Sequence, residues 1–463
     1  MKIPPVPPSF DEMLSEIGGD PDKARFLFSP MGENVISGPY DHWDKIRFKP
    51  ALGSLSPEET WAVIKFRRAA AQRFLPLRDE RNRMFFFTQI ADLQRALHEI
   101  DSNARGPIGM PGIAATSENR DVYLQKSLVE EPFSSSVLEG AATTREIARK
   151  MIEEGRKPET AGERMVLNNY RAMSFVRTHA TEPLTPERVL ELHRILTEDT
   201  LERPEKAGVL RSADDDVRVI DSASGETLHR PPSADQLPAR LAALCDFANA
   251  SDAGAGAFLH PVIRAIVLHF MLAYDHPFWD GNGRCARALF YWCVLKHGYW
   301  LLEYVSISSV IMRAPAKYGM AFLYSETDEG DLTYFIIHQL DAIERALADL
   351  QHYLLAKSKE LSDLGKALGD LERLLNRRQL GIMQEGLERP GTTFTIAQIV
   401  DSHGVSYLTA RSDLERLAKM KLLKKTKEGV KSVFLVPADL RERLGVARLP
   451  VLRPSSMRGP IVR

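Results

Sequence analysis

The chain of 463 residues is poor in cysteine, in excess charge and in long apolar runs. Its three cysteines, Cys245, Cys285 and Cys293, have neither the spacing of disulfide partners nor that of metal ligands, which indicates a reducing compartment. A formal charge of -1 excludes a global field that draws the whole chain to nucleic acid or to a membrane. No apolar run reaches membrane-spanning length, and residues 1–10 lack the apolar core of a signal peptide. We therefore expect a cytoplasmic protein with no membrane partner.

The rest of the composition is that of an ordinary globular protein, with 44% apolar and 27% charged residues. At this length we expect more than one domain, about three. Residues 1–55 are rich in proline, glycine and aromatics and predict irregular structure. A cap, a proline and two acids at residues 56–59 predict a helix that continues to about Arg73 and ends before Pro76. A second helical stretch is predicted at residues 88–100.

Helical periodicity dominates much of the chain up to about residue 368 and predicts a mainly α fold. The pattern is broken where residues 217–220 and 226–229 flank a Ser/Gly turn, so that we expect a β-hairpin there. Helices are predicted on both sides of this hairpin, at residues 144–155, 161–178, 185–197, 236–249, 261–275, 284–296 and 332–368.

The C-terminal part has a different pattern. Two predicted helices, at residues 395–402 and 406–419, are followed by two predicted strands at residues 421–424 and 432–436. Helix, turn, helix and hairpin is the order of a winged helix-turn-helix domain.

The same part carries local positive charge. Between Arg411 and Lys431 there are eight basic residues and three acidic ones, a net charge of about +5. DNA is therefore a candidate partner at residues 405–431. Docking of another protein is the alternative, because winged helices serve both purposes and lysines often only solvate a surface.

The densest chemistry lies at residues 276–287, which read HPFWDGNGRCAR. His276 is a base near neutral pH, and Asp280 is a carboxylate that can hold Mg²⁺. The amides of a Gly-Asn-Gly turn that opens a helix form a cradle for an anion. Arg284 and Arg287 share one face of that helix, although a helix N-terminus favours negative charge. A bound polyphosphate would explain both arginines, so the pattern predicts a nucleotide site with a base beside it.

This stretch matches, at every fixed position, the pattern HxFx(D/E)GNGRxxR of Fic-domain proteins. The preceding His260-Pro261 and the apolar helix that follows are also similar to that family, and the resemblance covers about residues 120–345. It implies a helical core with a β-hairpin flap and the transfer of AMP from ATP to a protein hydroxyl. It further implies that the flap, at residues 217–229, binds the target protein by strand addition.

The resemblance also assigns roles within the motif. It implies that His276 deprotonates a Ser, Thr or Tyr of the target and that Asp280 holds Mg²⁺ between the phosphates. Arg284 would help to hold the phosphates, and Arg287 would hold the γ-phosphate. The α- and β-phosphates would lie in a cradle formed by Gly281, Asn282 and Gly283.

A second run reads SSSVLEG from Ser134 and predicts the start of a helix, for which a capping box is one explanation. The run also resembles the family's inhibitory pattern (S/T)xxxE(G/N) through Ser135, Glu139 and Gly140. This resemblance implies that Glu139 pairs with Arg287 and so removes the partner of the γ-phosphate. ATP would then bind with its α-phosphorus misaligned.

We therefore expect five parts along the chain. In order they are an N-terminal mostly helical region at 1–118, a Fic catalytic domain at 119–345 with an N-terminal inhibitory helix near 134–146, a connecting helix at 346–370, a winged-helix domain at 371–440 and a disordered tail at 441–463.

Several alternatives stay open at this point. A DNA-binding transcriptional regulator could use the core only to sense a nucleotide, although an intact His276 is not needed by a pure sensor. The same fold could transfer another nucleotide or phosphocholine, or remove AMP, because the motif reads phosphates more than bases. His229 stands where the family commonly has an aromatic residue, and Tyr318 is a candidate for the adenine pocket. A homodimer is as compatible with the sequence as a monomer.

Overall fold

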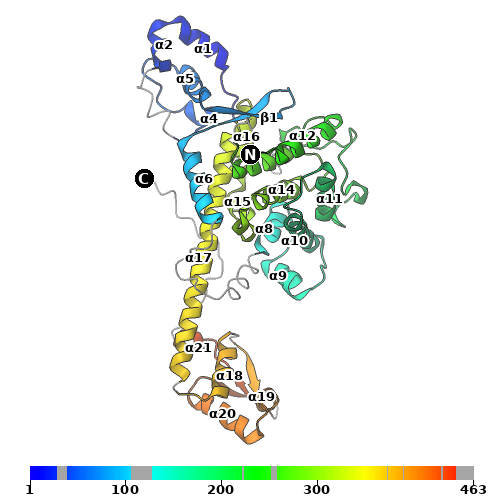
Figure 1. Ribbon diagram of the computed structural model, residues 1–463, viewed down its shortest axis with the longest axis vertical. Coiled ribbons are helices and arrows are strands. Elements are labelled where there is room, and N and C mark those ends of the chain that lie inside the picture. The colour runs from blue at the N-terminus through cyan, green and yellow to red at the C-terminus, as the bar shows by residue number, and fades with distance from the viewer. Residues whose placement is uncertain are drawn as a thin grey trace. The chain divides into compact units, whose positions relative to one another are not determined.

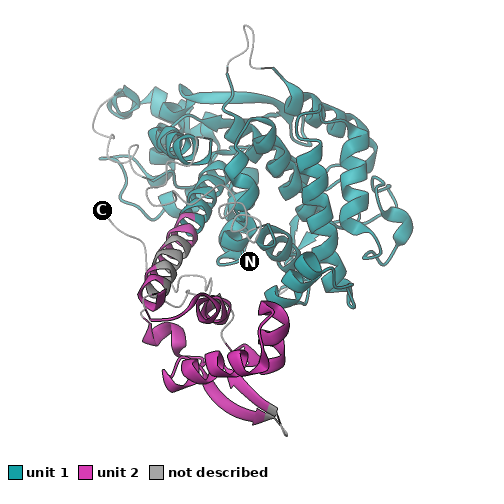
Figure 2. Ribbon diagram, turned by 60° about the horizontal axis from the view of Figure 1, so that its bottom comes forward, with its two compact units in different colours: residues 1–109, 121–350 teal, residues 110–120, 351–463 magenta. Residues whose placement is uncertain are grey.

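The structure is a computed structural model that describes residues 1–28, 39–105, 128–221, 224–251, 258–372, 374–388, 391–428 and 431–444. The chain divides into two compact units, one of residues 1–109 and 121–350 and one that holds residues 351–463 (Figure 2). The expected domain boundary at residue 118 lies outside the described residues, as does most of the expected tail. The tail's first residues are helical instead, in α21 (Leu440–Arg443).

Residues 1–55 contain helices, so the expectation of irregular structure there is wrong. These helices are α1 (Phe10–Gly19), α2 (Pro21–Phe28) and α4 (Trp43–Ile46). Apolar side chains from α1 and α2 pack on α5 (Pro57–Ala69), around the buried Ile17, Phe26 and Val63. The helices are short, and their hydrophobic face is completed by α5, so that periodicity within each one is a weak signal. The predicted start of α5 is confirmed, with a capping box between Ser56 and Glu59.

An antiparallel pair of strands, β1 (Gln72–Arg78) and β2 (Met84–Thr88), follows α5. The predicted continuation of the helix to Arg73 is therefore wrong. Aromatic residues favour a pleated, half-buried surface, and Phe85 and Phe87 are buried there. Because β2 runs to Thr88, the next helix, α6 (Ala91–Ala104), begins three residues later than predicted.

The rest of the larger unit is a bundle of helices (Figure 1). They are α8 (Glu130–Leu138), α9 (Arg145–Glu154), α10 (Ala161–Thr178), α11 (Pro186–Thr197), α12 (Leu237–Asn249), α13 (Pro261–Asp275), α14 (Asn282–Lys296), α15 (Ile307–Ile311) and α16 (Pro315–Thr327). Short 3₁₀ turns lie at Pro204–Lys206, Ala234–Gln236 and Trp300–Tyr304. Helix α13 packs along α14, and α10 packs on α8, α11 and α14. Every residue of α13 except Ala273 is buried, because the helix lies at the centre of this bundle.

The predicted hairpin is present but shorter than expected, as β3 (Val219–Ile220) and β4 (Thr227–His229). Val219 pairs with His229, and Ile220 pairs with Thr227. The carboxylate of Asp221 accepts hydrogen bonds from the backbone amide and the hydroxyl of Ser224, which shapes the described part of the turn. Residues 222 and 223 lie outside the described residues.

Helix α17 (Thr333–Glu372) leads into the smaller unit. The elements that follow are α18 (Arg377–Glu388), β5 (Thr393–Thr395), α19 (Ile396–His403), α20 (Tyr407–Lys419), β6 (Lys424–Glu428) and β7 (Lys431–Leu435). The strands form an antiparallel sheet in the order β5-β7-β6. Among the described residues, no helix is both long and apolar enough to cross a membrane.

The predicted pair of helices in the smaller unit lies at α19 and α20, capped by Thr395 and Ser406. The first strand of the hairpin is shifted from the prediction at residues 421–424. Lys421 has a left-handed backbone with a φ of 61°, and Leu422 and Leu423 enter the core, so pairing begins only at Lys424. The prediction missed β5, which has three residues and therefore little pattern of its own.

Candidate active site

His276 ends α13 in a left-handed backbone conformation, with a φ of 44°. Its amide still donates to the carbonyl of Leu272, and Pro277 prevents the helix from continuing. The carbonyl of His276 accepts a hydrogen bond of 2.8 Å from Nε of Arg211, which the sequence analysis did not identify. A histidine with positive φ is uncommon, and it is fixed here by contacts on both sides.

The hydrogen bonding of the His276 ring assigns its tautomer. Nδ1 lies 3.0 Å from the carbonyl oxygen of Ala273, which can only accept, so Nδ1 carries the hydrogen. Nε2 is then the basic nitrogen. Burial lowers the pKa of His276, so the ring is neutral at neutral pH and can take up a proton.

Two side chains shape the turn after His276. Asn282 was expected to bind phosphate, and His193 was not identified from the sequence. The amide of Asn282 accepts from the Phe278 backbone at 2.9 Å and donates to it at 2.8 Å, so the side chain holds the loop. The backbone amide of Asn282, at the N-terminus of α14, can fill the role that was expected for this residue at the phosphates. The ring of Phe278 stacks on His193 at 3.7 Å between centroids.

His193 in α11 links the turn to the rest of the bundle. Its Nδ1 accepts from the amide of Gly208 at 2.9 Å, so its Nε2 donates to the Asp280 carbonyl at 2.8 Å. Burial lowers the pKa of His193 to about 4, which keeps this tautomer neutral. Gly281 has a φ of 84°, and a Cβ there would lie 2.9 Å from Thr197. His193 is far from the motif in sequence and belongs to no pattern, so the sequence did not indicate this role.

The carboxylate of Asp280 lies at the edge of the turn with its side chain 51% exposed. One oxygen accepts from the amide of Gly281 at 2.6 Å, and the other lies 3.4 Å from Arg284. No group of three or more His, Cys, Asp or Glu that could hold a metal occurs in the described part of the chain. A single exposed carboxylate does fit Mg²⁺ that is held mainly by substrate phosphates and water.

Both arginines of the motif are 1% exposed. Arg284 donates to the carbonyl of Leu196 at 3.1 Å, and its Nε has no partner among the described residues. A buried donor of this kind would be satisfied by an anion in the turn. Cys285, between the two arginines, is fully buried, and burial raises the pKa of its thiol, so it is not a nucleophile.

Arg287 is occupied by the inhibitory segment, which we define as residues 134–140. Its Nε donates to Oγ of Ser135 at 2.9 Å, and its terminal nitrogen donates to the Ser135 carbonyl at 3.0 Å. The same nitrogen donates to Oε1 of Glu139 at 2.9 Å. Although burial raises the pKa of Glu139, the charges of Arg287 and Arg284 outweigh this effect and lower it, so the carboxylate is charged. The structure thus brings together the residues expected to form the inhibited pair.

The Glu139 carboxylate also covers the phosphate cradle. A Cβ atom at Gly283 would lie 2.2 Å from Oε1 of Glu139, so this oxygen fills the space above the glycine. The adjacent Gly140 has a φ of 92°, a conformation that favours glycine, and lets the chain turn away. Glu139 therefore competes with any anion that binds over Gly283 for the same space.

The prediction that the inhibitory segment opens a helix is wrong. Ser135 lies in the last turn of α8, Glu139 is its C-cap, and the next helix, α9, begins only at Arg145. The start of α8 lies earlier because Glu131 is buried against α15. Its carboxylate accepts from Oγ of Ser306 at 2.8 Å and from the amide and hydroxyl of Ser308 at 3.1 and 2.6 Å. The capping-box explanation of the serines therefore does not hold.

The motif and the inhibitory segment line one cavity of about 300 Å³. His276, Gly283, Arg287 and Glu139 form one side of it. Tyr318, the candidate for the adenine pocket, also lines the cavity and hydrogen bonds to His269 at 2.8 Å. The remaining lining residues are Met1, Leu138, Val219, Leu228, His229, Ala273, Tyr274, Gly319, Phe322, Leu323 and Glu326.

Comparisons with known proteins agree with this site. The family model for the Fic/DOC family matches residues 183–294, which include the whole motif. "Protein adenylyltransferase Fic" of Nematostella vectensis is 26% identical over 313 residues, 64% of this chain and 67% of that protein. The protein of the same name from Drosophila mojavensis is 26% identical over 296 residues, 64% of this chain and 51% of that protein. The chain thus spans about two thirds and about half of these two relatives.

A solved structure supports the fold. A Fic family protein from Desulfovibrio desulfuricans superimposes with a TM-score of 0.50 and 18% identity, over 76% of this chain and 97% of that one. The inhibitory segment lies outside the matched range 183–294, so its assignment depends on the contact with Arg287. The family match, together with the geometry of the motif, identifies residues 183–294 as a Fic domain.

Proposed function

We propose that this chain is a protein adenylyltransferase, which transfers AMP from ATP to a Ser, Thr or Tyr hydroxyl of a target protein or of itself. The observation that carries the proposal is the neutral His276, whose basic Nε2 belongs to a ring that lines the same cavity as Gly283 and Arg287. Nucleophilic attack at a phosphorus atom needs a base, a cradle for the phosphates and a cation that binds them.

The steps follow from these positions. Nε2 of His276 takes the proton of the acceptor hydroxyl as the oxygen forms a bond to the α-phosphorus. The bond between the α-phosphorus and the bridging oxygen breaks, and pyrophosphate leaves. The backbone amides of Asn282 and Gly283, at the N-terminus of α14, and the buried Arg284 offset the negative charge of the phosphates.

Under this proposal a magnesium ion would bind at Asp280, whose carboxylate is exposed at the edge of the turn. When bound, Mg²⁺ would neutralise phosphate charge, as it does in other phosphoryl-transfer sites. The acceptor would be presented by the flap at residues 217–229, through pairing of the target with a strand edge.

Inhibition by Glu139 is part of the proposal. With Glu139 on Arg287 and over Gly283, the γ-phosphate loses its cation and meets a negative charge. A nucleotide bound beside it would place its α-phosphorus out of line with Nε2 of His276. Removal of the carboxylate should therefore start the reaction.

The experiment compares wild type, His276→Ala and Glu139→Gly with Mg²⁺ and labelled ATP, CTP, GTP or UTP. We expect Glu139→Gly to gain the mass of AMP from ATP on itself or on a lysate protein, and Glu139→Gly/His276→Ala to gain none. Fragment mass spectrometry then identifies the modified hydroxyl. Absence of any nucleotide from Glu139→Gly would refute the transfer, and loss of AMP from a modified protein would favour hydrolysis.

The smaller unit has the order of elements of a winged helix, and we propose DNA as its partner at residues 405–431. Arg411 and Lys425 both pair with Glu415, at 3.1 Å each, which lowers the charge available to phosphates. A band-shift series of the full chain with duplex DNA at rising salt tests this proposal. Binding that is absent, or that does not weaken with salt, would count against it. Sedimentation of the same sample distinguishes a homodimer from a monomer.

A further inference from the structure

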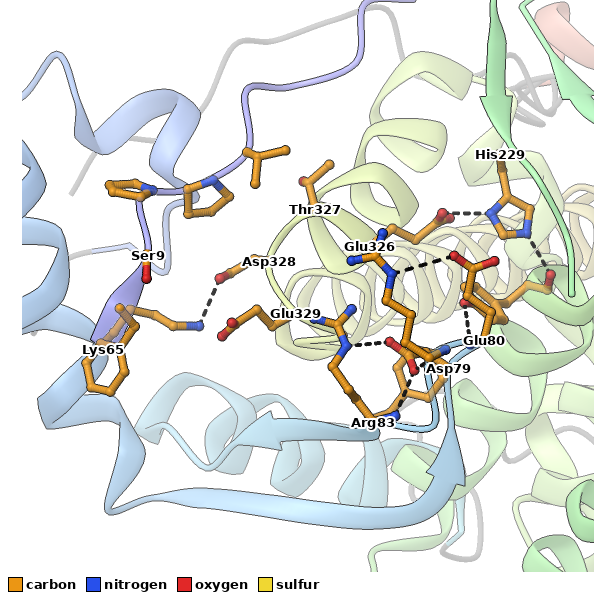
Figure 3. Close-up of a pocket in the computed structure, with 18 of the residues that line it drawn as sticks. Ser9, Lys65, Asp79, Glu80, Arg83, His229, Glu326, Thr327, Asp328 and Glu329 are labelled. Atoms are coloured by element: carbon orange, nitrogen blue, oxygen red, sulfur yellow. Dashed lines mark hydrogen bonds and ion pairs between the residues drawn. The ribbon is translucent and has the colours of Figure 1, made fainter. Parts of the chain in front are cut away.

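His229, the last residue of β4, lies between two cavities and is 8% exposed. One cavity is that of about 300 Å³ beside His276. The other, of about 630 Å³, is lined by the β1–β2 connection and the residues after α16 (Figure 3). Leu228, Tyr274 and Glu326 line both cavities together with His229. His229, at the end of the flap, is thus part of the wall between the two cavities.

Both ring nitrogens of His229 face acceptors. Nδ1 lies 2.7 Å from Oε2 of Glu326, and Nε2 lies 2.7 Å from the carbonyl oxygen of Tyr274 (Figure 3). A carbonyl oxygen can only accept, and an ionised carboxylate can only accept. Each nitrogen must therefore carry a hydrogen for both bonds to form, and the ring is an imidazolium.

These two acceptors belong to elements that build the active site. The Tyr274 carbonyl lies in the last turn of α13, two residues before His276. Glu326 lies in the last turn of α16, the helix that also carries Tyr318. His229 itself is paired with Val219 across the hairpin. One ring therefore connects the flap to the helix that carries the base and to the helix that lines the nucleotide cavity.

We propose that the His229 imidazolium is the positioning residue that holds the flap beside His276. The inference rests on the proposed function, because it assigns to the flap the task of bringing an acceptor hydroxyl within reach of Nε2. A fixed flap edge presents the acceptor in one register. A flap that leaves α13 carries the acceptor out of reach, while the nucleotide keeps its own contacts in the cradle.

Charged groups on the surrounding elements favour the imidazolium. Although burial lowers the pKa of His229, Glu326 and the Tyr274 carbonyl outweigh this effect and raise it above its ordinary value of 6.5. Glu80, from the β1–β2 connection, acts in the same direction. Asp275 and His276 also lie near enough to interact with the ring; Asp275 pairs with Arg240 at 2.6 Å.

The sign of the pH dependence follows. A group with a raised pKa in the folded state contributes fully below its unfolded value of about 6.5 and loses its contribution as the pH rises through the folded value. The flap is therefore held below pH 6.5 and is released as the pH rises through the raised pKa of His229. His276, with its lowered pKa, limits the reaction on the acid side instead. The two histidines together predict a bell-shaped profile whose alkaline limb belongs to His229.

Hydrogen exchange tests the flap contact without any catalysis. We expect the β4 amides of His229→Gln to exchange about 10- to 100-fold faster than those of wild type after correction for intrinsic rates, because one charge-assisted bond pair is lost. Glu326→Gln should move the onset of flap opening to lower pH. His179→Gln is the matched control and should leave β4 unchanged, because the His179 ring bonds to the Phe175 carbonyl in the last turn of α10. Equal β4 exchange in wild type and His229→Gln would overturn the inference.

Transfer assays in the Glu139→Gly background give a second readout. His229→Gln should lower AMP incorporation about 10- to 100-fold with ATP affinity unchanged, and Glu326→Gln should shift the alkaline limb toward lower pH. An alkaline limb that stays in place in Glu326→Gln would contradict the inference. If Glu139→Gly transfers no AMP at all, the proposed function fails, and the exchange experiment alone decides the role of His229.

Discussion

Removal of the Glu139 carboxylate is expected to activate the protein by a predictable factor. The carboxylate makes a charge-assisted hydrogen bond of 2.9 Å to Arg287, and its side chain is only 27% exposed, so solvent screens the pair incompletely. A hydrogen bond to a charged group contributes about 1.5–3 kcal/mol. Arg287 keeps its two bonds to Ser135 in the variant. Release of the one competing contact should therefore raise AMP transfer roughly 10- to 150-fold.

The assay is the initial rate of AMP incorporation from labelled ATP, measured at saturating Mg²⁺ above pH 6. Glu139 is charged there, because its lowered pKa keeps the contact intact until the pH falls well into the acid range. Glu139→Gln separates charge from size. Glu130→Gln is the matched control, because Glu130 lies on the same helix and pairs with Arg145 at 3.0 Å, away from Arg287. Equal rates in wild type, Glu139→Gly and Glu130→Gln would refute the competition for Arg287.

Other changes have equally defined outcomes. His276→Ala should lower transfer about 10²- to 10⁴-fold without changing the thermal midpoint by more than a few degrees, as measured by initial rates and calorimetry. The acid limb of the rate profile should have its midpoint below pH 6.5, since burial lowers the pKa of His276, and a midpoint above 6.5 would contradict the assignment. Asn282→Ala should cost about 1–3 kcal/mol in urea unfolding for each Phe278 backbone group that it leaves unpaired. Arg287→Lys should lose both the contact to Ser135 and inhibition, and isothermal titration should show weaker ATP binding.

The motif at residues 276–287 was predictable because its chemistry is local. A base, a carboxylate, a turn and two arginines stand within twelve positions, and His276, Gly283 and Arg287 of this motif line one cavity. What sequence could not show is how the motif is held. Arg211 and His193 reach it from distant loops and helices through hydrogen bonds to backbone carbonyls. Such contacts depend on tertiary packing and leave no spacing to recognise.

The errors in the predicted secondary structure have physical causes as well. The serines at residues 134–136 resemble a helix start, but the buried Glu131 fixes an earlier turn of the same helix, so they lie at its end. Residues 84–88 are aromatic and alternate poorly, yet they form a strand because β1 lies beside them. Long helices such as α13 and α17 were predicted well, since their periodicity is repeated over several turns.

Glu139 and the γ-phosphate compete for the guanidinium of Arg287, but only Glu139 belongs to the same polypeptide as this arginine. A tethered group acts at an effective concentration set by geometry, which for short links is millimolar or higher. A rise in nucleotide concentration therefore relieves the inhibition poorly, whereas displacement of α8 relieves it directly. The hydrogen bonds of Glu131 to Ser306 and Ser308 hold α8 in place. Any partner that weakens this anchor would therefore start the proposed AMP transfer without touching the nucleotide.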